Sequence, residues 1–182
     1  MSQKPGAHAL ISAAPAPDFD HPLEMLAACH DRIEDRCDVL HRLIGHLAKE
    51  GCDPQARQAA VSVMRYFDTA GEHHHADEEI DLFPLVASRS GEPGALALIE
   101  RLLSDHTRMR ALWQSLRAAL QPIADGGATA LDPSLVERFS TLYRAHIQLE
   151  EAELLPLAAR VLSPEEQAAL GVVMARRRGV KS

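Results

Sequence analysis

The sequence has few cysteines, few aromatic side chains and no long hydrophobic run. Of its 182 residues only three are cysteine and 4% are aromatic. No apolar stretch approaches the roughly 18 residues that a membrane-spanning helix needs, and no hydrophobic signal segment follows a basic start. The cysteines, Cys29, Cys37 and Cys52, lack a CxxC spacing, which favours free thiols in a reducing compartment. We therefore expect a soluble, cytoplasmic protein with no membrane partner.

Positive charge is also scarce. The chain carries 19 Lys and Arg against 26 Asp and Glu, for a formal net charge of -7. Arg176-Arg177-Arg178 is the one basic run, and we expect it to form a solvated helix terminus. A nucleic-acid partner is excluded because phosphate contacts need a larger basic surface. No HExxH, GxSxG or P-loop motif supports hydrolytic or phosphoryl-transfer chemistry.

Apolar residues recur at alternating steps of three and four residues, which places them on one face of a helix. Asp53-Pro54 and Asp132-Pro133 each combine an N-cap with a proline at the first helical position, and Gly51 is a stop signal. Four helices of about 25 to 30 residues are predicted from this pattern. Their inward stripes run from Leu23 to Leu47, from Val63 to Leu85, from Leu96 to Leu120, and from Leu135 through Leu149, Glu150 and Glu153 to Leu157.

Short connections between long helices predict an all-α, up-down-up-down antiparallel four-helix bundle. Ser163-Pro164-Glu165-Glu166 is a capping box that predicts a short fifth helix to about Ala175. Residues 1–20 mix small residues and prolines without a period, which predicts a flexible lead. The expected organisation is therefore a lead over 1–20, a bundle over 21–162, and a short C-terminal helix with a basic tail over 163–182.

The chain has ten histidines, and each of the four stripes contains one of them. These are His30, His74, His106 and His146. Each lies at nearly the same distance in residues from the turn that joins its helix to the next, so an antiparallel bundle brings all four to one level. Buried imidazoles and carboxylates without partners would cost several kcal/mol per group. A metal site would remove that cost.

Two of the histidines belong to a repeated motif. His74-x-x-x-Glu78 and His146-x-x-x-Glu150 each place an imidazole and a carboxylate on one helix face. Each pair can hold one metal ion, and two pairs suggest two ions. In both motifs a proline follows the glutamate by six residues, as Pro84 and Pro156, and we expect it to kink or end the helix.

With these residues in view, the sequence resembles the hemerythrin-like, or HHE cation-binding, family over roughly residues 21–160. The resemblance is carried by His30, by His74-His75-Ala-Asp-Glu78-Glu79 with its Leu-Phe-Pro ending, by His106, and by His146-Ile-Gln-Leu-Glu150. It implies a four-helix bundle with a non-haem centre of two iron ions. His30, His74, His106 and His146 become terminal ligands, and Glu78 and Glu150 become bridging ligands.

One departure from the family concerns position 110. Oxygen-carrying members have a second histidine one turn after the third-helix histidine, but this chain has Arg110 there. A coordination position is then open, or filled by water, by Glu34 or by a neighbouring histidine. This departure argues against simple reversible oxygen carriage.

Other polar residues are weaker candidates. His73 and His75 are expected to be solvated or to support the ligands from behind, and Tyr143 could donate a hydrogen bond near His146. The remaining histidines are expected at the surface, namely His8, His21, His41 and His46.

Three functions fit the pattern. The first is a di-iron protein, a monomer or homodimer, that binds or reacts with dioxygen, nitric oxide or peroxide as a sensor, scavenger or store. Its enzyme activity, if any, would be that of an oxidoreductase. The second is a ferritin-like iron oxidase, for which the chain offers one Glu-x-x-His match, Glu72 with His75. The third is a zinc-binding or metal-free interaction bundle.

Overall fold

The computed structural model describes residues 18–180, and every regular element within that range is helical. Eight α-helices and three π-helical segments follow one another along the chain. The bounds are α1 Pro22–Glu50, α2 Pro54–Tyr66, η1 Phe67–Gly71, α3 Glu72–Ala76, η2 Asp77–Leu82, α4 Phe83–Arg89, α5 Ala95–Ala124, α6 Pro133–Leu149, η3 Glu150–Leu154, α7 Leu155–Val161 and α8 Pro164–Arg177.

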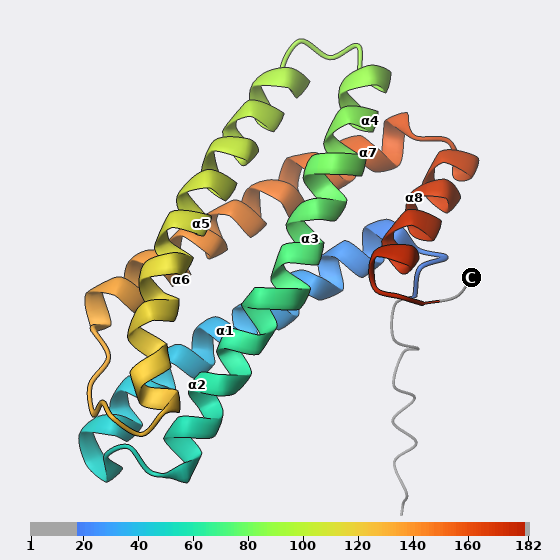
Figure 1. Ribbon diagram of the computed structural model, residues 1–182. Coiled ribbons are helices and arrows are strands. Elements are labelled where there is room, and N and C mark those ends of the chain that lie inside the picture. The colour runs from blue at the N-terminus through green and yellow to red at the C-terminus, as the bar shows by residue number, and fades with distance from the viewer. Residues whose placement is uncertain (1–17, 181–182) are drawn as a thin grey trace, which may run out of the picture.

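These segments form four long rods. They are α1 alone, the run from α2 to α4 with its two π-helical segments, α5 alone, and the run from α6 to α7. Successive rods lie side by side and run in opposite directions (Figure 1), and α1 and α5 each pack against both α2 and α6. The predicted up-down-up-down four-helix bundle with a fifth C-terminal helix is confirmed. No helix within residues 18–180 is both long enough and apolar enough to cross a membrane.

The helices begin and end where the sequence signals place them. The side chain of Asp53 accepts a hydrogen bond from the backbone N–H of Ala56, and Asp132 accepts one from Ser134. Gly51 ends α1 with a φ of 73°, in the left-handed region that favours glycine. The capping box of Ser163 and Glu166 is present, and α8 continues two residues beyond the predicted Ala175.

Pro84 and Pro156 do not end their rods, which was one of the two expected effects. Each follows a π-helical segment and lies in the first turn of the next α-helix. A proline ring clashes with the carbonyl four residues earlier, here that of Ile80 or Ala152. Both carbonyls belong to the π-helical segments η2 and η3, whose wider turn relieves the clash. The chain therefore stays helical through both motifs.

The π-helical turn changes which side chains face inward after it. Glu153 was predicted within the inward stripe, but it is exposed, and Leu154 is buried in its place. The prediction for the third stripe is also wrong at its start. Leu96 and Leu103, predicted to face inward, are exposed, and Leu98 and Leu102 are buried instead. The start of α5 packs against α4, and this contact selects the buried face.

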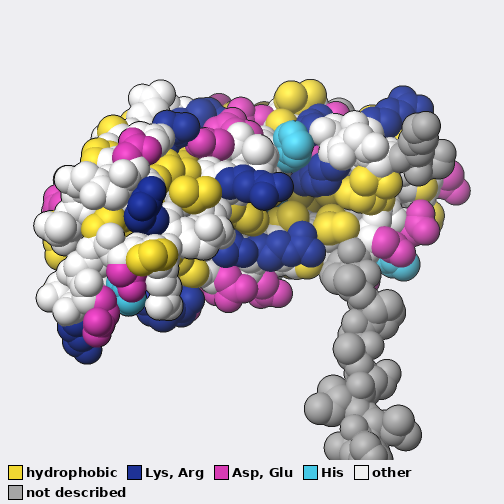
Figure 2. Space-filling model, turned by 60° about the horizontal axis from the view of Figure 1, so that its bottom comes forward, with side chains coloured by type: hydrophobic (Ala, Val, Ile, Leu, Met, Phe, Trp, Pro, Cys, Tyr) yellow, Lys and Arg dark blue, Asp and Glu magenta, His cyan; other side chains and the backbone are white. Residues whose placement is uncertain are grey.

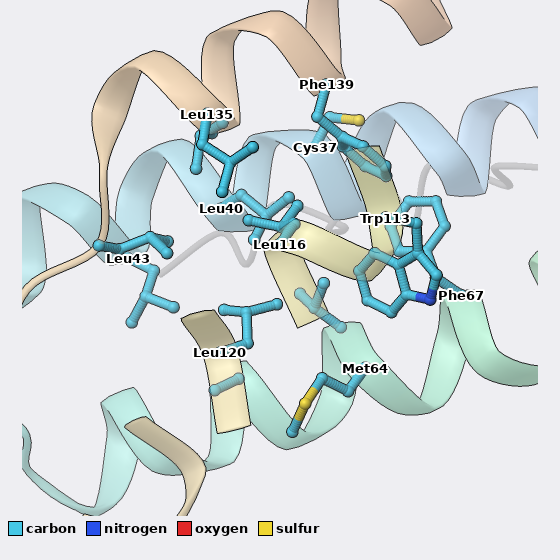
Figure 3. Packing of buried hydrophobic residues seen from close by; sticks show 14 of the residues in the cluster. Cys37, Leu40, Leu43, Met64, Phe67, Trp113, Leu116, Leu120, Leu135 and Phe139 are labelled. Carbon is cyan, nitrogen blue, oxygen red and sulfur yellow. The ribbon is translucent and has the colours of Figure 1, made fainter. Parts of the chain in front are cut away.

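Two apolar clusters fill the bundle, one on each side of the level of the four histidines. Figure 3 shows the first, in which the ring of Phe67 packs against Trp113 and Phe139 at centroid distances of 4.9 and 5.0 Å. The second contains Leu26, Phe83 and further residues of α4, α5, α7 and α8. The polar residues of the four stripes therefore lie between two apolar regions.

The C-terminal segment differs from its prediction. Arg177 and Arg178 do not form a solvated terminus, because both donate hydrogen bonds to Asp77. Of the predicted flexible lead, residues 1–17 lie outside the described residues. Residues 18–20 precede α1, and Phe19 packs against the second apolar cluster.

Replacing Phe139 by alanine should lower the free energy of unfolding by about 3 to 5 kcal/mol, because a fully buried ring leaves a cavity. Chemical denaturation monitored by circular dichroism measures this change. Ile80→Ala is the matched control, since Ile80 is 65% exposed and should shift stability little. Equal losses for the two variants would contradict the assigned core.

Candidate metal centre

Four rods bring six ionisable side chains to one point between the apolar clusters. His30 comes from α1, and His106 comes from α5. The two motifs supply His74 and Glu78 from the second rod and His146 and Glu150 from the fourth. Each of the six is at most 1% exposed. The structure therefore brings together all six residues that the sequence proposed as ligands.

The six residues form two overlapping groups with the donors of a metal site. One group contains His30, His74, Glu78 and Glu150, and the other contains His106, His146, Glu78 and Glu150. Within each group the ligand atoms lie within 4.8 Å of one another. The two glutamates belong to both groups, so the arrangement suits a pair of ions rather than one.

Each glutamate presents one oxygen to each group. For Glu78, Oε1 lies 3.3 Å from His74 Nε2 and Oε2 lies 3.4 Å from His106 Nε2. For Glu150, Oε2 lies 3.2 Å from His30 Nε2 and Oε1 lies 3.0 Å from His146 Nε2. All four histidines therefore turn the same ring nitrogen, Nε2, toward the carboxylates.

These short separations are not matched by hydrogen-bond geometry. His30 Nε2, Glu78 Oε2 and both carboxylate oxygens of Glu150 are buried without a hydrogen-bond partner. The Nε2 atoms of His106 and His146 lie 2.9 Å apart, but the four atoms without partners have only the other donors of their groups around them, within 4.8 Å. Ligands of a common cation have this geometry, and it leaves buried polar atoms unsatisfied otherwise.

The charges of the site also favour a cation. Burial and the nearby carboxylate of Glu150 raise the pKa of Glu78 well above its ordinary value. Burial lowers the pKa of His74 and of His106, which keeps these imidazoles neutral with a lone pair free. Burial opposes a charge on His30, but Glu150 raises the pKa of that imidazole to about 9, so protons on His30 and Glu78 balance the charge of the metal-free centre. Divalent cations would take the place of those protons, because cations and protons alike compensate buried carboxylates.

Two more carboxylates support the histidines from behind. Glu79 Oε1 lies 2.8 Å from His106 Nδ1, and Glu151 Oε1 lies 3.1 Å from His30 Nδ1. Because an ionised carboxylate only accepts, each Nδ1 donates to it, and the neutral form of each imidazole then has its lone pair on Nε2, where a metal can bind. Neither role is predicted above, although the repeated Glu-Glu pair in the two motifs is a signal for both.

Arg110 belongs to this outer layer. Its guanidinium donates a hydrogen bond of 2.6 Å to Glu79, and its side chain is 40% exposed. Partial burial would raise the pKa of Glu79, but the hydrogen bonds from Arg110 and His106 bring it below its ordinary value. Arg110 thus keeps ionised the carboxylate that orients His106. Glu34, the alternative ligand, is exposed and lies in neither group.

The neighbouring histidines divide into buried and outer residues. His75 is buried, stacks on His106 at a centroid distance of 4.1 Å, and lies 3.4 Å from the Tyr143 hydroxyl. Tyr143 therefore contacts His75 and not His146. The predicted surface position is found for only some of the outer histidines. His21 is largely exposed, His41 and His46 are half-buried beside Ser140 and Asp53, His73 is half-buried, and His8 lies outside the described residues.

Cavities near the centre are small. One of about 10 Å³ is lined by His75, Arg110, Tyr143 and neighbouring residues, and it has room for one water molecule at most. A larger groove of about 920 Å³ lies on the surface between α5 and α6, and none of the six ligand candidates lines it.

Figure 2 shows acidic, basic and hydrophobic side chains mixed over one face of the molecule.

Two comparisons bear on this centre. A family model described as the hemerythrin HHE cation binding domain matches residues 21–158. An uncharacterized protein of Haemophilus influenzae is 31% identical over 163 residues, which cover 90% of this chain and 93% of the relative. The family match includes all six residues of the two groups and ends before α8.

Replacing Glu79 by alanine should weaken metal binding by about 10- to 100-fold, because His106 loses the acceptor that orients it. Isothermal titration calorimetry with the metal measures this change in affinity. Glu153→Ala is the matched control, since Glu153 is an exposed carboxylate of the same kind of motif. An unchanged affinity in the Glu79 variant would refute the orienting role.

Proposed function

Because the chain belongs to the hemerythrin family of HHE cation-binding domains, we propose that it holds two iron ions between His30, His74, His106 and His146, with Glu78 and Glu150 shared by both. The ions bind or react with a small oxidant, which is dioxygen, nitric oxide or peroxide. The protein acts as a sensor, scavenger or store of such a molecule or of iron.

The observation that carries this proposal is the orientation of the two shared glutamates. Each has one oxygen beside a histidine of the first group and the other beside a histidine of the second group. A carboxylate placed in this way can bridge two ions. A single ion would leave one oxygen of each glutamate buried and unpaired, at a cost of several kcal/mol.

The choice of iron rests on the donors. Imidazole and carboxylate ligands suit iron, whereas sites that prefer magnesium or calcium are built from oxygen alone. Each group offers two imidazole nitrogens and two carboxylate oxygens, which is fewer ligands than an octahedral ion takes. When bound, the iron pair supplies the remaining coordination positions and the capacity to exchange electrons with the oxidant.

The residues of the chain have three roles at this centre. The four imidazoles and two carboxylates would bind the metal ions, while Glu79 and Glu151 orient two of the imidazoles. The apolar clusters on both sides exclude bulk water and strengthen the electrostatic interactions at the centre. Since the ligand candidates are at most 1% exposed, the size of the partner is limited to a few atoms. This limit favours a diatomic molecule or peroxide over a larger substrate.

The alternatives have less support. A ferritin-like iron oxidase would use Glu72 and His75 as its Glu-x-x-His motif, but Glu72 is exposed and neither residue belongs to a ligand group. A structural zinc site closes four ligands around one ion, whereas two carboxylates here are shared between groups. A metal-free bundle would leave the oxygens of Glu150 buried without partners.

The purified protein should bind two irons per chain after anaerobic loading. Replacing Glu78 or Glu150 by alanine should release at least one iron, because each glutamate serves both groups. Metal analysis by plasma emission measures the stoichiometry. Glu34→Ala is the matched control and should retain both irons, since Glu34 is exposed.

One iron or fewer in the folded wild-type protein would refute the di-iron proposal. Retention of both irons by the Glu78→Ala, Glu150→Ala double variant would show that other carboxylates bridge the ions.

The reduced, iron-loaded protein should oxidise in air and not return to its starting spectrum when oxygen is removed. The expected reason is that Arg110 contributes no ligand where oxygen carriers have a histidine, which leaves the iron more accessible to a second molecule. Ultraviolet-visible spectra through several cycles of aeration and deoxygenation test this, with nitric oxide added in a parallel series. Full spectral recovery over many cycles would instead indicate an oxygen carrier.

A further inference from the structure

The C-terminal helix α8 lies outside the residues that the family model matches, yet it reaches the metal centre's immediate neighbourhood. The match ends at residue 158 and α8 begins at Pro164. In Figure 1 α8 lies across the end of the molecule, near the start of α1 and beside the second rod. Its contacts include α1 and the π-helical segment η2, which contains Glu78.

A cluster of four charges joins α8 to η2. Arg177 donates hydrogen bonds to Asp77 and Asp81, and Arg178 donates one of 2.6 Å to the other oxygen of Asp77. Asp77 is fully buried, and the two arginine side chains are only 19% and 18% exposed. Both oxygens of a buried carboxylate are thus held by guanidinium groups from a single helix.

The buried aspartate directly precedes the shared glutamate. Successive side chains of a helix point in different directions, so Asp77 binds the arginines while Glu78 faces the metal centre. Fixing the side chain of Asp77 therefore fixes the rotation of η2 about its own axis, and with it the direction of Glu78.

The second motif has no equivalent contact. In the fourth rod the residue before Glu150 is Leu149, an apolar side chain packed against the second cluster. The two motifs share their histidine, glutamates and proline but differ at this position. The ionic contact with α8 is therefore specific to the Glu78 side of the centre.

A close backbone contact holds α8 in place. A Cβ atom at position 171 would lie 1.8 Å from the carbonyl oxygen of Phe19, so this site accepts only glycine. The guanidinium of Arg178 lies over the Phe19 ring at 5.7 Å from its centroid. The segment before α1 therefore contacts the same Arg178 guanidinium that binds Asp77.

We propose that Arg177 and Arg178 are positioning residues for the metal centre, which act through Asp77 to hold Glu78 in the direction that serves both ligand groups. This inference rests on the proposed function, since it assigns α8 a role in a metal centre. It makes the C-terminal helix part of that centre, although no residue of α8 belongs to either ligand group.

Cobalt(II) is the probe metal for the test, because its visible absorption reports the arrangement of its ligands. The double variant R177Q/R178Q should bind cobalt at least tenfold more weakly than wild type, and its absorption bands at saturation should shift. R177K/R178K, which keeps both charges, should restore part of the affinity. R176Q is the matched control, since Arg176 is exposed on the same helix, and it should behave as wild type.

The unfolding midpoints of the metal-free proteins separate positioning from simple stabilisation. A lower midpoint for R177Q/R178Q with an unchanged cobalt affinity and spectrum would overturn the proposal. If the double variant does not fold, the nearly isosteric D77N variant replaces it and should show the same loss of affinity and the same spectral shift. Wild-type binding in D77N would equally overturn the proposal.

Failure of the proposed function would look different. In that case the wild-type protein and R176Q would bind no cobalt, and both proposals would be rejected. Binding of two cobalt ions by wild type and by R177Q/R178Q alike would reject only the role of α8.

Discussion

Four imidazoles and two carboxylates lie within an otherwise apolar bundle, and the rest of the structure is arranged around their burial. Transferring such groups from water costs several kcal/mol each unless partners compensate. Here the carboxylate of Glu150 has no hydrogen-bond donor within the described residues, and burial together with the negative charge of Glu150 raises the pKa of Glu78. A pair of divalent cations would satisfy both carboxylates together. The same ions would link all four rods at one level.

The two rods that carry the carboxylates are not uniform α-helices. A proline six residues after each shared glutamate cannot donate a backbone hydrogen bond, and a π-helical turn precedes it in both rods. The wider turn shifts the side chains that follow, which is why Leu154 and not Glu153 is buried. A feature of the backbone therefore connects the ligand motif with the packing of the apolar cluster beyond it.

Support for the ligands comes in layers. Glu79 and Glu151 hold two imidazoles from behind, and Arg110 holds Glu79 in turn. This second layer gives the arginine at position 110 a role outside the ligand set, since its charge stabilises the carboxylate that orients His106. Residues outside the two groups thus fix the orientation of residues within them.

Sequence alone determined the four rods, the short fifth helix and most of their ends, because periodicity, capping residues and glycine act locally. It also determined the level of His30, His74, His106 and His146, since helical rise converts residue counts into height. Only the tertiary structure decided which oxygen of Glu78 faces which group, that Arg110 binds Glu79, and that Arg177 and Arg178 reach Asp77. Those contacts join residues far apart in the chain, and no local pattern encodes the rotation of one rod against another.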